Sequence, residues 1–145
     1  MSPVTGLVID SISFDNEWND NILELKNYSN GKLHGLFKTM QFGGDEIYIS
    51  EVNWKNGIEH GAYKYDDGSL RQTGKYNDGK KEGRWRTFWY GHLNEEGNYN
   101  YGMKEGMHSK WYIQTDILNS KKKYVNGTLI SAKCWDENGN AILCN

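Results

Sequence analysis

The chain has 145 residues, of which 37% are hydrophobic and 14% aromatic, and it carries a formal net charge of −2. This length suits one small domain, and the aromatic share indicates a buried surface made of ring faces more than of aliphatic side chains. No apolar run is long enough to span a membrane, and the absence of a basic stripe argues against nucleic acid as the main partner.

Residues 1–27 contain no recurring pattern, and we expect them to form N-terminal capping strands. Their first residues, MSPVTGLVIDSISF, have neither the basic start nor the long apolar stretch of a signal peptide. We therefore expect a cytoplasmic protein.

Residues 28–145 contain a unit of the form aromatic-x-x-Gly-x-x-x-Gly, whose copies start 22 to 26 residues apart. The ten residues that begin at Tyr76 and the ten that begin at Tyr99 share six identities. A fifth copy, at Tyr124, has Ser131 in place of the second glycine and is expected to be a degenerate C-terminal cap. The complete copies place their aromatic residue and two glycines at Tyr28, Gly31 and Gly35, at Trp54, Gly57 and Gly61, at Tyr76, Gly79 and Gly83, and at Tyr99, Gly102 and Gly106.

Turn signals separate short segments that are rich in aromatic and β-branched residues. Asn-Gly and Asp-Gly favour type I′ turns, which suit antiparallel hairpins because both central residues take positive φ. In the long interval between Gly102 and Gly127, we expect a further turn at residues 116–120. The expected turns are Asn30-Gly31, Gly43-Gly44, Asn56-Gly57, Asp67-Gly68, Asp78-Gly79, Gly91, Gly102, Asn126-Gly127 and Asn138-Gly139.

Together these signals predict an all-β protein with a single domain. Each repeat corresponds to one hairpin, so about five hairpins of 22–26 residues form an elongated, twisted antiparallel meander of about a dozen strands. The second glycine of each repeat falls inside a strand, where it indicates either a bulge or a ring lying flat on bare backbone. Phe37, Tyr63 and Trp85 follow that glycine by two residues and are the expected rings, and His108 takes this position in the fourth copy.

The sequence offers little support for catalysis, a metal site or a cofactor. His34, His60, Glu82 and Glu105 occupy equivalent positions of successive repeats, but such positions lie two strands, or about 10 Å, apart. Zinc ligands must all lie within about 2.3 Å of one ion, so this column cannot enclose a metal. We therefore expect no catalytic residue, no metal and no cofactor, and a protein that is not an enzyme.

Two cysteines, Cys134 and Cys144, lie near the end of the chain. A disulfide between them would close only the last hairpin, and a cytoplasmic chain keeps its thiols reduced. We expect free thiols.

Aromatic pairs beside arginines form a candidate protein-binding surface. Trp89-Tyr90 and Trp111-Tyr112 are extra aromatic pairs in the third and fourth copies. Aromatic side chains flanked by Arg84 and Arg86 have the composition of an interface hot spot, although simple packing of the rings is the alternative. Residues 1–50 carry a net charge of −4, and Asp45 and Glu46 in this acidic part could steer a basic partner.

The unit Y-x-x-G-K-x-x-G-x-W-x-x-[FY], seen at residues 76–88, resembles MORN-type repeats, and residues 89–106 are similar to the linker of the bacterial antitoxin-like variant. The resemblance covers roughly residues 28–136. It implies an elongated, curved sheet that binds a protein partner, and an antitoxin or immunity protein that neutralises a toxin domain. It also allows a scaffold or membrane-surface adaptor, to which the short basic run at residues 121–123 would contribute weak lipid contact. The oligomeric state stays open.

Overall fold

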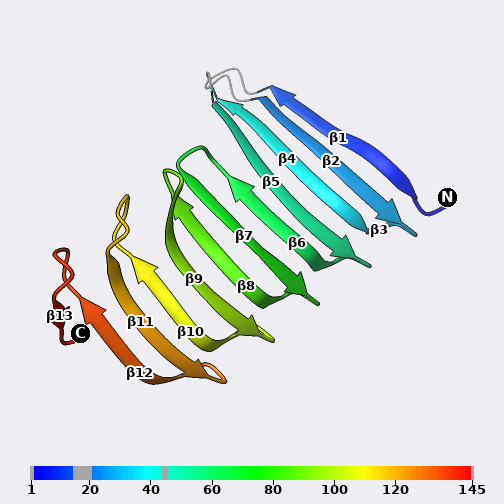
Figure 1. Cartoon of the computed structure of the whole chain (residues 1–145). Helices are drawn as coiled ribbons and strands as arrows, with labels where there is room; N and C mark the ends of the chain where they lie inside the picture. Colours follow the sequence, from blue (N-terminus) through cyan, green and yellow to red (C-terminus); the bar gives the residue numbers. More distant parts are fainter. Residues whose placement is uncertain (1, 15–20, 44–45, 145) are drawn as a thin grey trace.

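A computed structural model describes residues 2–14, 21–43 and 46–144, and they form one antiparallel sheet (Figure 1). Successive strands lie beside one another in chain order from β1 (Gly6–Phe14) to the C-terminal β13 (Ala141–Ile142), and β3 (Lys32–Leu33) pairs only with β2 (Asn21–Ser29). The predicted all-β class and the meander are confirmed. No helix in the described ranges could cross a membrane.

The sheet has 13 strands among the described residues. Besides the four named above, the strands are β4 (Gly35–Gly43), β5 (Glu46–Lys55), β6 (Ile58–Asp66), β7 (Leu70–Asn77), β8 (Lys80–Trp89), β9 (His92–Asn100), β10 (Met103–Trp111), β11 (Leu118–Val125) and β12 (Thr128–Trp135).

The tight turns occupy most of the expected positions. Asn56 and Gly57 both have positive φ, 53° and 83°, as a type I′ turn requires. Tyr90 and Tyr101 take the same left-handed position before Gly91 and Gly102, although tyrosine is not a preferred turn residue. Gly44 lies outside the described residues. The turn expected at residues 116–120 was placed too late, because β10 ends at Trp111 and the chain turns over residues 112–117.

The turn at the start of each repeat is fixed to the preceding hairpin by a backbone hydrogen bond. The N–H of the first repeat glycine donates to a carbonyl about one repeat earlier, so this glycine both makes the turn and joins neighbouring units. Each repeat of 22–26 residues therefore adds one hairpin that is hydrogen-bonded to the hairpin before it. The bonds are Gly31 to Val4 at 2.9 Å, Gly57 to Leu33 at 2.8 Å, Gly79 to Glu59 at 2.9 Å, Gly102 to Lys81 at 2.9 Å and Gly127 to Lys104 at 2.9 Å.

The residue before the second repeat glycine also contacts the next turn. Glu82 Oε2 accepts a hydrogen bond from the N–H of Tyr101 at 3.0 Å, and Glu105 Oε2 accepts one from the N–H of Asn126 at 2.8 Å. His60 Nδ1 lies 3.2 Å from a carboxylate oxygen of the turn residue Asp78. These positions of the His/Glu column therefore tie successive hairpins together.

The second repeat glycine marks a bulge, which was one of the two expectations for this position. Gly61, Gly83 and Gly106 have φ values of 114°, 66° and 71°, which side chains rarely adopt. The strand register shifts at each of them: on the facing strand at residues 52–54 and 73–75 for Gly61 and Gly83, and between residues 105 and 109 of the same strand for Gly106. The bulge turns the ring that follows it onto the neighbouring strand.

The sheet has two faces, which we call the ring face and the opposite face. The ring face carries Tyr63, Trp85 and His108, and the opposite face carries Arg84 and Arg86, because side chains alternate along each strand. Strand pairing places Tyr63 opposite Gly74 and Trp85 opposite Gly97, so large rings alternate with bare backbone across the sheet.

The rings do lie on bare backbone, but not on the second repeat glycine. A Cβ added to Gly74 would come within 3.0 Å of the Trp85 indole, and one added to Gly97 would come within 3.0 Å of the His108 imidazole. The expected ring was therefore right at Trp85, His108 takes the same role in the fourth copy, and the expected glycine was wrong. The bulge at Gly83 or Gly106 displaces the following ring toward the adjacent strand, where Gly74 or Gly97 leaves room for it.

A row of rings in two groups forms the small core of the sheet. Trp85 is the one buried large hydrophobic residue in the described part of the chain, with 6% of its surface exposed. Its ring centroid lies 5.2 Å from that of Tyr63 and 5.0 Å from that of Tyr76, and its Nε1 donates to the Lys75 carbonyl at 3.2 Å. The second group contains Tyr99, His108 and Tyr124, with centroid separations of 5.3 and 5.2 Å, and Lys81 Nζ lies near both Trp85 and Tyr99.

The expectation of free thiols is wrong, because a disulfide joins Cys134 to Cys144. Cys134 pairs with Ile142 across β12 and β13, and a turn closed by the N–H of Asp136 and the carbonyl of Asn140 reverses the chain between them. This reversal brings the two Cα atoms to 5.3 Å, a normal disulfide separation. The bond closes only the last hairpin.

Candidate functional site

The described sheet has no second layer over either face, and many of its apolar side chains are exposed. In the described part of the chain, one large hydrophobic residue is buried and 15 large hydrophobic residues are exposed, among them Leu36, Met107 and Ile130. Where such exposed apolar side chains adjoin one another, they are typical of surfaces that contact another molecule. The candidate sites are therefore areas of the two faces.

On the opposite face, two arginines converge on one carboxylate. Arg84 forms an ion pair with Glu96 through its Nη2 and Nε atoms, and Arg86 Nε lies 3.7 Å from the same carboxylate oxygen. On the same face, the guanidinium of Arg71 in β7 lies 4.4 Å from the ring centroid of Phe88 in β8. These contacts hold the arginines in place, and the Glu96 carboxylate also neutralises part of the charge of Arg84 and Arg86.

A hollow of about 730 Å³ adjoins the Arg84–Glu96 pair on the opposite face. Its wall includes Met107, Trp111 and Lys121, so the structure brings the predicted residues Arg84 and Trp111 to one site. A half-buried Trp beside an exposed Met and an Arg has the composition of an interface hot spot.

The other predicted aromatic residues do not join this site. Trp89 ends β8 on the ring face, and Tyr90 lies in the following turn with 57% of its surface exposed. Tyr112 follows β10, and its hydroxyl donates to the Trp135 carbonyl at 2.8 Å, which ties the β10–β11 turn to the end of β12. The two similar dipeptides therefore occupy different surroundings.

The predicted acidic steering residues cannot be placed. Asp45 lies outside the described residues. Glu46 begins β5, but its side chain lies outside the described part of the structure.

The ring face has a polar hollow of about 490 Å³ near β4–β7. Tyr48, Tyr65 and Asp67 are among the residues that line it. The Asp67 carboxylate accepts hydrogen bonds from the N–H groups of Ser69 at 3.0 Å and Leu70 at 2.6 Å, so it shapes the β6–β7 turn. This carboxylate therefore has a structural role.

A second hollow on the ring face, of about 210 Å³, lies over β9–β11 and is basic. Lys104, Lys110 and Lys122 line it together with one carboxylate, Glu95. Lys104 Nζ lies 5.1 Å from the ring centroid of Tyr124, within the range of a cation–π contact. Among described residues, the ion pairs formed by lysines involve other positions, Lys26 and Lys38.

His108 borders the basic hollow and is 6% exposed. Its Nε2 lies 2.8 Å from the carbonyl of Asn98, so the neutral ring donates from Nε2. Burial lowers the pKa of His108, and Lys104 lowers it further, whereas the Asn98 hydrogen bond and Glu95 act in the opposite direction. The net result is a pKa below the usual value of 6.5.

We expect this imidazole to make the fold sensitive to acid. Because the folded pKa of His108 lies below its unfolded value, the unfolded state binds more protons, and the free energy of unfolding falls as pH drops through 6.5. Urea unfolding at pH 7.5 and pH 5.5 measures this loss. The control is His108→Phe, which keeps a ring but cannot titrate, and a loss as large in this variant as in the unmodified protein would contradict the assignment.

No group of three or more His, Cys, Asp or Glu side chains within the described ranges could hold a metal ion.

Sequence reasoning missed the residues that organise the ring face. Gly74 and Gly97 each precede a repeat tyrosine by two residues, and this Gly-x-Tyr spacing was visible in the third and fourth copies. The lysine hollow was not visible, because Lys104, Lys110 and Lys122 come from two strands whose register depends on bulges. In particular, Lys122 faces away from its neighbours Lys121 and Lys123.

No protein-family model matches this chain. No curated protein matches it either. The functional proposal therefore rests on the sequence pattern and on the two faces of the sheet.

Proposed function

We propose that this chain is a non-catalytic repeat protein that binds a protein partner. The observation that carries this proposal is the uncovered sheet, with 15 exposed large hydrophobic residues in the described part of the chain. Backbone hydrogen bonds and ring contacts already fix the strands, so little ordering is needed when a partner docks. A surface that is both apolar and pre-formed favours protein binding over catalysis.

The hollow beside Arg84 is the strongest support on the opposite face. Met107, with 45% of its surface exposed, and the half-buried Trp111 offer apolar area, while Arg84 and Lys121 surround it with charge. Arginine and tryptophan dominate measured hot spots because they combine large contact area with directed hydrogen bonds.

The specific form that we propose is an antitoxin or immunity protein of the MORN type, which sequesters a toxin domain. Support comes from the repeat pattern and from the acidic first third of the sequence, which would attract a basic toxin. A cytoplasmic location belongs to this proposal, and it requires that the Cys134–Cys144 bond open in a reducing compartment. Because that bond closes only the last hairpin, opening it leaves the surfaces of β8–β11 in place.

A scaffold or membrane-surface adaptor is the second candidate. Lys121, Lys123 and Lys133 are exposed on the opposite face, and Lys121 and Lys133 pair across β11 and β12. Such a group attracts anionic lipid by about 1 kcal/mol per lysine near the surface. Sedimentation with phosphatidylserine vesicles tests this alternative.

The proposed function is tested with the protein encoded beside this chain. The tagged chain is co-expressed with the product of the neighbouring reading frame, and we expect a stable complex and restored growth where that product alone is toxic. The control is Met107→Asp, which places a charge on the exposed apolar surface and should weaken the complex. If the two proteins do not associate and growth is not restored, the antitoxin proposal is wrong.

A further inference from the structure

The basic hollow on the ring face has a composition that points to one kind of ligand. We propose that Lys104, Lys110 and Lys122 bind the carboxylate side chains of an acidic segment of the protein partner. This inference rests on the proposed protein-binding function and adds to it a second contact, on the ring face, and the chemistry of that contact.

Two neighbouring strands supply the three lysines. Lys104 and Lys110 belong to β10 and Lys122 to β11, and pairing places His108 opposite Lys122 and Lys110 opposite both Glu95 and Ser120. All of them line the same hollow of about 210 Å³. The three lysines, of which Lys110 is exposed, therefore border one space that admits one or two side chains rather than a folded domain.

The charge of the hollow is not balanced from within. Three lysines and one carboxylate, Glu95, leave a net charge of +2 among its lining residues. No ion pair within the described residues involves Lys104, Lys110 or Lys122, whereas Arg84 and Arg86 on the opposite face already share Glu96. A partner's carboxylates would supply the missing countercharge.

Cation–π contacts with aromatic rings hold some of the lysine ammonium groups in position. Lys104 Nζ lies over the Tyr124 ring, and the equivalent residue of the preceding repeat, Lys81, lies 4.1 Å from the Trp85 centroid and 5.3 Å from that of Tyr99. Lys104 and Lys122 are half-buried, so water screens them less than fully exposed lysines. Lys81 extends the basic track along the row of rings toward β8.

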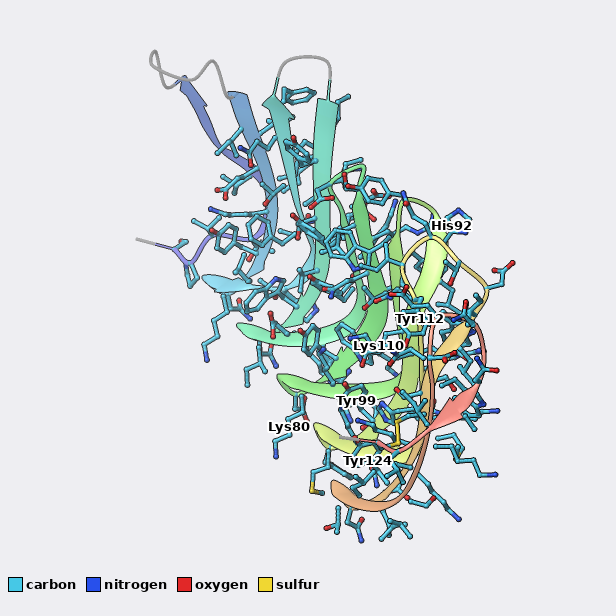
Figure 2. The ribbon with its side chains drawn as sticks, turned by 90° about the vertical axis from the view of Figure 1, so that its left-hand side faces the viewer. Lys80, His92, Tyr99, Lys110, Tyr112 and Tyr124 are labelled. Atoms are coloured by element: carbon cyan, nitrogen blue, oxygen red, sulfur yellow. A yellow bond between two sulfur atoms is a disulfide. The ribbon has the colours of Figure 1, made fainter. Side chains whose placement is uncertain are left out.

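The location of the hollow favours a protein segment over a membrane surface. Figure 2 shows the strands bending, with Tyr99 and Lys110 on the inner side of the bend, and Lys80 and His92 toward opposite ends of the strands. A flexible Asp or Glu side chain can reach into such a recess, but a flat bilayer would first meet the exposed lysines of the opposite face. A net charge of +2 also suits two carboxylates better than a densely charged headgroup layer.

Lys123 and Lys122 provide a matched test, because they are adjacent in β11 but face opposite sides of the sheet. Lys123 is a better control than Lys121, which lines the hollow beside Arg84. The full chain is titrated with fluorescein-labelled deca-glutamate, and binding is followed by fluorescence anisotropy. Lys122→Glu and Lys123→Glu change the net charge equally. We expect about tenfold or greater weakening for Lys122→Glu and less than about twofold for Lys123→Glu. Circular dichroism verifies folding, and Lys122→Gln should show an intermediate loss without charge reversal.

Four results would overturn this site. Equal weakening by the two charge reversals would mean that only overall charge matters. Binding of phosphatidylserine vesicles that depends on Lys122, without binding of deca-glutamate, would assign the hollow to a membrane. Binding of inorganic phosphate alone would assign it to a small anion. If a cognate partner binds both variants equally, the lysine site is wrong but the proposed function is unaffected. If the co-expression test fails, the proposed function is wrong, irrespective of the result with deca-glutamate.

Discussion

Replacing Trp85 by alanine is expected to lower the free energy of unfolding by about 3–5 kcal/mol, the usual range for removing a buried Trp or Phe. The effect should be large because Trp85 is the one buried large hydrophobic residue in the described chain. The substitution removes ring contacts with Tyr63 and Tyr76, the hydrogen bond to the Lys75 carbonyl and the cation–π contact with Lys81. Urea unfolding followed by far-ultraviolet circular dichroism measures the loss.

Trp89→Ala is the matched control for this change. Trp89 lies on the same strand and the same face as Trp85, but it is only half-buried and its nearest ring contact, with Tyr90, is 6.3 Å between centroids. We expect its replacement to cost clearly less. Equal losses for the two variants would contradict a row of rings centred on Trp85.

Adding a single methyl group to Gly74 is expected to destabilise the sheet by about 1–3 kcal/mol, the usual cost of overpacking. The backbone of Gly74 is not in the left-handed region, so alanine fits the strand itself. The cost arises because the new Cβ would overlap the Trp85 indole. Gly97→Ala should behave in the same way because its Cβ would overlap the His108 ring.

A double-mutant cycle separates this overlap from any general effect of alanine in a strand. In the Trp85→Ala background the indole is absent, so Gly74→Ala should be neutral or slightly stabilising. The coupling free energy between the two positions should therefore be of the same size as the loss caused by Gly74→Ala alone. If the two losses simply added, Trp85 would not lie on Gly74.

The hairpins and their turns could be predicted from the sequence because their signals are local. Asn56-Gly57 and Asp78-Gly79 fix their turns through their own backbone preferences, and the bulges follow from glycines at a fixed spacing after the turn. The β10–β11 turn was misplaced because it contains no Gly, and Gln114 takes the left-handed position instead.

The candidate site was harder to predict because it depends on which residues meet across strands. Trp89-Tyr90 and Trp111-Tyr112 look alike in sequence, yet Tyr90 is exposed in a tight turn while Tyr112 bonds to the Trp135 carbonyl. Likewise, three consecutive lysines read as one basic run, but alternation places Lys122 alone on the ring face. A shift of one residue at a bulge exchanges the faces, and sequence spacing does not locate such shifts.

The ring contacts of a single uncovered sheet are most directly tested by nuclear Overhauser spectroscopy of the full chain. We predict cross-peaks from the Trp85 indole to the Hα protons of Gly74 and to the rings of Tyr63 and Tyr76. We also predict no contact between these rings and any residue that lies more than two strands away in the sheet. Cross-peaks that place another part of the chain over Trp85 would show a covered face and would contradict both the open sheet and the binding surface inferred from it.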